Sequence, residues 1–261
     1  HMKSISELVY KISTYHFVFS ELIKRDFKKK YKRSVLGIFW SMLAPLFSLL
    51  VMNFIFSSFF GRTGEHYIIY LFSGIVVMTY FSQSTNTGMG ALVGNASIFS
   101  KVNVPKYLFV FSSVASASIN FSLTLILFFV FVFLDGLSFH FKFFFLIFPI
   151  ICLMLLSLGV AMILSAMNVF FKDIVYLYGV FMTALTYATP IFYPTSILGD
   201  RQYLFMFNPL FLVINYIREI VIYNRIPDFA YHAVTLSYCM VFLLVGFAVY
   251  KKYNYRFLYY A

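Results

Sequence analysis

Long runs without a single charged residue divide this sequence and restrict how it can fold. The uncharged runs are 34–61, 67–100, 107–134, 143–171, 174–199, 202–217 and 229–250. A helix that crosses the hydrocarbon core of a bilayer needs about 20 apolar residues, and all the runs except 202–217 reach that length. Charged residues make up 11% of the chain, against about 25% in soluble domains. The sequence therefore predicts an all-α polytopic membrane protein with six transmembrane helices.

The distribution of Lys and Arg predicts the orientation of the spans. With both termini in the cytoplasm, 15 of the 20 Lys and Arg residues fall on the cytoplasmic side and five on the outer side. The cytoplasmic flanks of membrane helices are enriched in these residues. A seventh span through 202–217 would move the basic C-terminus to the outer side, against this tendency. We therefore expect a multi-pass protein with both termini in the cytoplasm.

The segment before the last run carries residues that interrupt helices. Pro190 and Pro194 follow the fifth run, and Asn208-Pro209 divides the next apolar stretch. Proline ends helices because it lacks a backbone N–H and clashes with the preceding turn. The sequence therefore predicts short re-entrant helices that form an outer gate before the last span.

Residues 1–33 form a unit of their own. Apolar residues recur at helical spacing between positions 5 and 27, and seven of the ten residues 24–33 are Lys or Arg. A helix of this kind lies in the membrane interface, where its basic residues meet anionic headgroups, an anionic substrate or a cytoplasmic partner. We expect an N-terminal cytoplasmic amphipathic helix and basic turn at 1–33, followed by a transmembrane domain at 34–261.

The short cytoplasmic segment 95–107 has two possible interpretations. It contains Pro105, which ends any helix there. The segment is either an ordinary connecting loop or a small helix on which a cytoplasmic motor protein acts.

Several kinds of chemistry are missing from the sequence. No Gly is followed by Lys, so a P-loop for ATP is absent. The acidic residues lie outside the six spans, whereas ion-driven carriers keep ionisable groups at membrane depth. The histidines are scattered, and no cluster suggests catalysis or metal binding. We therefore predict a protein that is not an enzyme, with no catalytic residue, metal site or bound cofactor, and whose energy comes from another polypeptide.

The net charge of +11 lies mainly at membrane flanks, which favours contact with lipids over nucleic acid.

Aromatic residues are abundant, with 36 Phe and 21 Tyr. Contact with lipid tails and headgroups accounts for most of them. A few stand near polar residues, and aromatic faces with interspersed hydroxyls offer a surface along which a sugar chain slides. We hypothesise that these channel aromatics are Tyr80, Phe81, Tyr187, Phe192 and Tyr193.

The order of several motifs resembles a known family. The chain contains RDFKKKYKRSVLGIFWSMLAPLF, then NASIFSKVNVPKYLFV, NVFFKDI, TPIFYP, NPL and KKYNYRF. The most specific element is Y-x-x-S-x-L-G-x-x-W, formed by Tyr31, Ser34, Leu36, Gly37 and Trp40. The sequence is similar to the membrane subunits of polysaccharide-export ABC transporters, the O-antigen and teichoic-acid permeases, over residues 20–257.

The resemblance implies a homodimer of six-helix subunits in the bacterial cytoplasmic (inner) membrane, with two cytoplasmic ABC ATPase subunits that bind ATP and Mg. It implies export of a lipid-diphosphate-linked polysaccharide. The implied substrate entrance comprises Lys28, Lys29, Lys30, Lys32 and Arg33. The implied ATPase coupling residues are Ile98, Phe99, Lys101, Val104 and Pro105. Residues 195–224 would supply the outer gate helices.

Alternatives remain open at this stage. O-antigen is the first choice of substrate, with teichoic acid and capsule as related choices. A permease for a small hydrophobic compound would need a compact closed pocket rather than a wide passage. A glycosyltransferase or flippase acting alone belongs to a different class and would purify without an ATPase.

Overall fold

The computed structural model describes residues 2–32, 34–59, 65–101, 104–253 and 257. These residues form helices and loops, and no strand occurs among them. The α-helices are α1 (Met2–Tyr31), α2 (Trp40–Phe59), α3 (Tyr67–Met89), α4 (Ala91–Gly94), α5 (Ala96–Phe99), α6 (Tyr107–Leu134), α7 (Ile147–Phe170), α8 (Ile174–Ala188), α9 (Pro209–Val221) and α10 (Phe229–Tyr253). Three 3₁₀ segments join them: η1 (Gly37–Phe39), η2 (Phe141–Leu146) and η3 (Thr195–Phe207). The expectation of an all-α membrane fold is confirmed.

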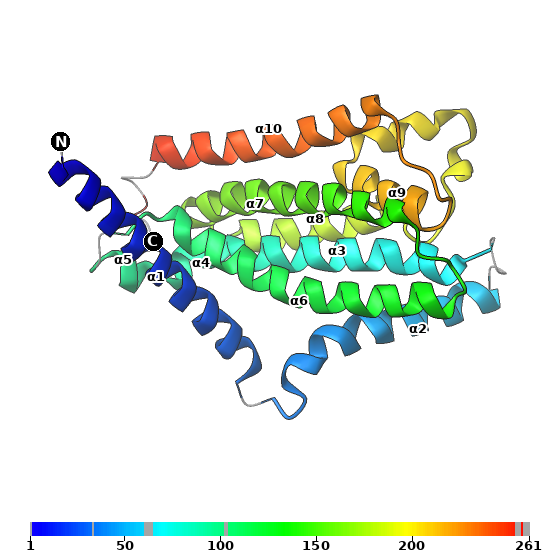
Figure 1. The fold of residues 1–261 in the computed structure, drawn as a ribbon, viewed down its shortest axis with the longest axis horizontal. Coiled ribbons are helices and arrows are strands. Elements are labelled where there is room, and N and C mark those ends of the chain that lie inside the picture. Colours follow the sequence, from blue (N-terminus) through cyan, green and yellow to red (C-terminus); the bar gives the residue numbers. More distant parts are fainter. Residues whose placement is uncertain (1, 33, 60–64, 102–103, 254–256, 258–261) are drawn as a thin grey trace.

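Within the described residues, five helices are long and apolar enough to cross a bilayer, and a sixth crossing results if η3 and α9 are counted as one bent span. The five segments are Gly37–Phe56, α3, α6, Phe141–Phe170 and α10. In Figure 1, α3, α6, α7, α8 and α10 run side by side, while α2 diverges from the bundle toward its N-terminal end. The first helix and the last turn of α10 lie at the same end of the bundle.

The fifth uncharged run, 174–199, is not one continuous helix. Its helical part, α8, has 15 residues and ends at Ala188 because Pro190 cannot continue the hydrogen-bond ladder. At 1.5 Å per residue, α8 is about 22 Å long, shorter than the roughly 30 Å of a hydrocarbon core. The sequence predicted the helix end near Pro190 correctly.

The segment after α8 turns back on itself at the end of the bundle opposite to α1 (Figure 1). The η3 segment and α9 meet at an angle of 113° at Asn208, whose side chain caps α9 by accepting bonds from the Leu210 and Phe211 amides. Pro209 occupies the first turn of α9, where its missing N–H costs nothing. This bent pair has the shape expected of the re-entrant helices predicted from the sequence.

The helices α7 and α10 touch at backbone level. A Cβ atom added at Gly159 of α7 would lie 2.5 Å from the carbonyl carbon of Phe242 in α10, and one added at Gly246 would lie 3.0 Å from the Gly159 oxygen. Small residues allow membrane helices to approach closely, where dispersion replaces the hydrophobic effect as the attraction. The two glycines therefore hold α7 and α10 together as a closely packed pair.

The described buried apolar residues form two clusters, of which the larger joins α3, α6, α7 and α9. The second hydrophobic cluster lies toward the end of the bundle where α1 crosses it. It joins α1, α4, α5, α6, α7 and α10 through buried residues that include Leu22, Phe99, Phe109 and Tyr250. The side chain of Phe257 is fully buried in the same cluster. The ammonium of Lys106 lies 5.7 Å from the ring centre of Phe99 and 5.9 Å from that of Phe257. The short helix α5 therefore shares one packed cluster with the N-terminal helix α1 and with Tyr250 and Phe257 near the C-terminus.

We expect Gly159→Ala to destabilise the protein, because the new methyl group forces α7 away from the α10 backbone. Overpacking of this kind costs typically about 1–3 kcal/mol. The measurement is thermal unfolding of the purified protein in detergent. Gly179→Ala in α8 is the matched control, since a Cβ there meets nothing within 4 Å. An equal melting temperature for the two variants would contradict the close packing of α7 and α10.

Candidate functional site

A polar cavity of about 1180 Å³ lies between α1, α3, α6 and α8, with α4 and Asn95 at one end. Its walls are rich in hydroxyl and amide side chains. These polar residues are Thr79, Ser82, Gln83, Asn86, Thr87, Asn95, Ser113, Ser116, Asn120, Thr183 and Thr186. The cavity is large enough for a group well beyond the size of a single ion or water cluster.

The cavity extends from the end of the bundle near α1 to the middle of the membrane domain. On α3 its lining begins at Met78, halfway along the helix, and continues beyond the end of that helix to Asn95. Polar side chains at membrane depth are costly unless they face a partner or a water-filled space. The side chains of Asn86, Thr87 and Thr186 donate to carbonyls of their own helices, at 2.8 to 2.9 Å. The side-chain oxygens of these residues can still accept a hydrogen bond from water or from a ligand.

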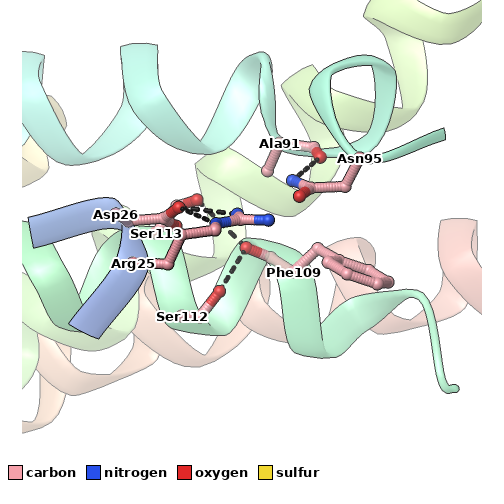
Figure 2. A network of polar contacts seen from close by, with 7 residues as sticks. All are labelled: Arg25, Asp26, Ala91, Asn95, Phe109, Ser112 and Ser113. Carbon is pink, nitrogen blue, oxygen red and sulfur yellow. Dashed lines mark hydrogen bonds and ion pairs between the residues drawn. The ribbon is translucent and has the colours of Figure 1, made fainter. Parts of the chain in front are cut away.

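Basic residues of α1 form the rim of the cavity. Lys29 and Lys30 border it, and so does Arg25, which is paired with its neighbour Asp26 at 2.6 Å. Figure 2 shows this pair beside Ser113 of α6, with the Arg25 guanidinium pointing from α1 toward Asn95. Surrounding protein lowers the pKa of Lys30, because burial disfavours the ammonium, although part of the side chain remains exposed. An anionic group that enters here therefore meets two ammonium groups.

The hydroxyl of Tyr31 closes the rim on the α6 side by donating to the side-chain oxygen of Asn120. Tyr31 is the last residue of α1. This bond ties the end of the amphipathic helix to the wall of the cavity, so displacement of α1 changes the cavity directly.

The structure separates the residues predicted for the substrate entrance. Lys28, Lys29 and Lys30 lie in the last turn of α1, since the helix continues to Tyr31 instead of ending in a basic turn at Lys28. Only Lys29 and Lys30 border the cavity, while Lys28 and Lys32 are exposed elsewhere. Arg33 lies outside the described residues.

The hypothesis of an aromatic-lined passage does not match this cavity. None of the five predicted channel aromatics borders it, and its described lining contains no aromatic ring. Tyr80 and Phe81 are buried in the core, where the Tyr80 ring packs 4.4 Å from that of Phe121. Phe192 is also buried and stacks on Phe56, whereas Tyr187 is 65% exposed and Tyr193 is half-buried. Helical rotation explains the difference: on α3, Ser82, Gln83 and Asn86 face the cavity, and Tyr80 and Phe81 face the neighbouring helices.

The structure supports the small-helix interpretation of segment 95–107. Helix α5 spans Ala96–Phe99, and Lys101 is exposed after it. Phe99 and Val104 are buried, while Ile98 and Pro105 are half-buried. Lys101 and the outer side of α5 are therefore open to solvent, and the role of the five residues in ATPase coupling stays a prediction.

Arg218 is a buried residue whose role the sequence did not reveal. Its side chain is 1% exposed and donates to Ser73 Oγ and to the carbonyls of Tyr70, Pro190 and Ile191, at 2.8 to 3.4 Å. The guanidinium carbon lies 3.4 Å from the Tyr70 ring centre. Arg218 therefore fixes α9 and the non-helical segment after α8 against α3.

The polar wall was also missed, although the sequence carries a signal for it. Eight of the nine residues 79–87 are Ser, Thr, Asn, Gln or Tyr, within an otherwise apolar run. Such a concentration inside a membrane span indicates a hydrated surface.

Comparison with known proteins decides the family. The sequence profile described as ABC-2 type transporter matches residues 18–222, which is most of the chain. This chain belongs to the ABC-2 type transporter family. The matched region contains the whole cavity and the buried Arg218.

Individual ABC-2 relatives align along almost their whole length. The chain is 26% identical over 239 residues to a protein named O-antigen export system permease protein RfbA from Klebsiella pneumoniae, covering 90% of this chain and 92% of the relative. It is 26% identical over 228 residues to RfbA from Myxococcus xanthus, covering 85% and 86%. It is 24% identical over 238 residues to the polysialic acid transport protein KpsM from Escherichia coli, covering 88% and 91%.

We expect single cysteines placed on the cavity wall to react with a charged, water-soluble thiol reagent. Gln83→Cys and Thr183→Cys border the cavity, whereas Val77→Cys on the same α3 helix is fully buried and serves as the control. The measurement is labelling of the protein in membranes by mass spectrometry. The native Cys152 and Cys239 are both buried and are replaced by Ser in every sample. Equal labelling of Gln83→Cys and Val77→Cys would contradict a water-filled cavity.

Proposed function

We propose that this chain is the membrane subunit of an ATP-driven exporter that moves a lipid-diphosphate-linked polysaccharide outward, with O-antigen as the substrate. The observation that carries the proposal is the cavity, which combines cations at its rim with a long hydroxyl and amide wall. The lysines suit a diphosphate, and the wall suits sugar hydroxyls, which both donate and accept hydrogen bonds. The names of the relatives give the same substrate class.

Energy comes from a cytoplasmic ABC ATPase in this proposal. The membrane chain binds no cofactor, and ATP and Mg are held by two copies of the partner. The short helix α5 is the contact, because the second hydrophobic cluster connects Phe99 to Phe109 of α6 and to Tyr250 of α10. A displacement of α5 therefore moves α6, which forms part of the cavity wall, together with the C-terminal end of α10.

A homodimer completes the transporter in this proposal. Helix α2 diverges from the bundle (Figure 1) and exposes a row of large apolar residues. These residues are Phe47, Leu50, Val51 and Phe54. A second copy that packs on α2 would enclose a wider passage than one subunit forms alone.

Capsular polysaccharide is the second candidate substrate, because KpsM is also a relative. Teichoic acid would meet the same rim and wall. A small hydrophobic compound suits the cavity less, because such ligands prefer closed apolar pockets, whereas most residues that line this cavity have hydroxyl, amide or charged side chains. Location in the bacterial inner membrane with both termini in the cytoplasm agrees with the basic residues of α1 and α10.

Affinity purification from the native membrane tests the proposed function. We expect a stoichiometric P-loop ATPase to accompany the chain, and ATP-dependent movement of lipid-linked O-antigen when both are reconstituted in liposomes. A protein that purifies without an ATPase and still moves or modifies a lipid-linked sugar would instead be a flippase or transferase acting alone.

The two lysines at the rim provide a matched test of substrate entry. We expect Lys29→Gln combined with Lys30→Gln to lower the affinity for the lipid-linked substrate by roughly thirtyfold, because each lysine contributes about 1 kcal/mol to anion attraction near a membrane. Lys28→Gln combined with Lys32→Gln removes the same charge from the same segment without touching the cavity. The measurement is the substrate dependence of export in the reconstituted complex. If the two pairs of substitutions had equal effects, the basic residues at 28–32 would act through general attraction to lipids or as a docking surface for a partner.

A further inference from the structure

Asn95 has a buried acceptor for which the structure provides no donor. It lies at the break between α4 and α5, and its side chain is 6% exposed. Its Nδ2 donates to the Ala91 carbonyl at 2.7 Å, but its Oδ1 has no hydrogen-bond partner. The residue borders the polar cavity together with Arg25 and Ser113 (Figure 2).

The orientation of the Asn95 amide is determined by Ala91. If the amide were rotated by half a turn, Oδ1 would face the Ala91 carbonyl oxygen, and two acceptors would oppose each other. The unpartnered atom is therefore an oxygen and needs a donor. The Arg25 guanidinium donates to Asp26 through its Nε and one terminal nitrogen and makes no hydrogen bond to this oxygen.

A buried acceptor without a partner costs about 1–3 kcal/mol, so a ligand that supplies a donor gains affinity there. A phosphate diester or a diphosphate at neutral pH offers only acceptor oxygens to the site. A sugar hydroxyl offers a donor. Asn95, Lys29 and Lys30 border one cavity, which suits a sugar that is joined directly to a phosphate.

We propose that Asn95 accepts a hydrogen bond from a hydroxyl of the glycosyl residue next to the diphosphate, and thereby reports occupancy of the cavity to α5. This inference rests on the proposed function and names the part of the substrate that one residue recognises. The backbone carbonyl of Asn95 accepts bonds from the amides of Ile98 at 2.9 Å and Phe99 at 3.3 Å. The same residue thus contacts the ligand through its side chain and begins α5 through its backbone.

The test compares three lipid diphosphates on the full complex in nanodiscs. One is unglycosylated, the second carries one N-acetylhexosamine, and the third carries the same sugar with its hydroxyls methylated. We expect the native complex to bind the second at least fivefold more tightly than the third, since the hydrogen bond to Asn95 is lost together with bonds to the wall. Asn95→Ala should make this affinity difference about fivefold smaller and bind the unglycosylated lipid as the native complex does.

The ATPase rate supplies an independent readout. Stimulation by the glycosylated lipid should fall in Asn95→Ala and persist in Ser237→Ala, which changes an exposed residue of α10 outside both the cavity and α5. Equal affinity of the native complex for the glycosylated and methylated lipids would overturn the inference, and the donor to Asn95 Oδ1 would then be water. This result needs no variant, so a folding defect in Asn95→Ala cannot obscure it. If the native complex bound none of the three lipids, the proposed function itself would fail.

Discussion

Polar groups inside a bilayer need partners, and this requirement organises the structure. Backbone N–H and C=O groups outside helices are tolerated at membrane depth only where protein or water satisfies them. The segment after α8 meets the requirement through protein: Arg218 binds the carbonyls of Pro190 and Ile191, and Tyr70 donates to the Pro190 and Tyr193 carbonyls. The polar wall of α3, α6 and α8 meets it through the open cavity. One end of the bundle is therefore closed by a guanidinium, and the other is open to solvent.

The hydrophobic cluster near α5 connects this open end to the site of energy input in the proposed mechanism. Phe99 packs against Phe109, which lies on α6 one turn before Ser113 and two turns before Ser116 of the cavity wall. Leu22 of α1 belongs to the same cluster, and Arg25 lies one turn further along α1 at the cavity rim. Rim, wall and α5 share one packed core, so they change position together.

The sequence was sufficient for the helices and their order, because uncharged runs and basic flanks are local signals. It also located the end of α8 through Pro190 and the break at Asn208. It did not show which face of α3 borders the cavity, since Tyr80 and Ser82 stand two positions apart in the same polar stretch. The role of Arg218 was hidden for a different reason: its acceptors lie on residues 70, 73, 190 and 191, which only tertiary packing brings together.

The short length of α8 has a consequence for the surrounding lipid. Tyr176, Leu177, Val180 and Phe181 expose large side chains along it, yet a helix of about 22 Å falls short of a hydrocarbon core of roughly 30 Å. Hydrophobic mismatch of this size makes the bilayer thin locally or draws polar headgroups inward. The barrier to a charged headgroup is lowest where the hydrocarbon is thinnest. A bilayer that adapts to α8 would therefore be thinnest on the flank of the protein that carries Thr183 and Thr186 of the cavity wall.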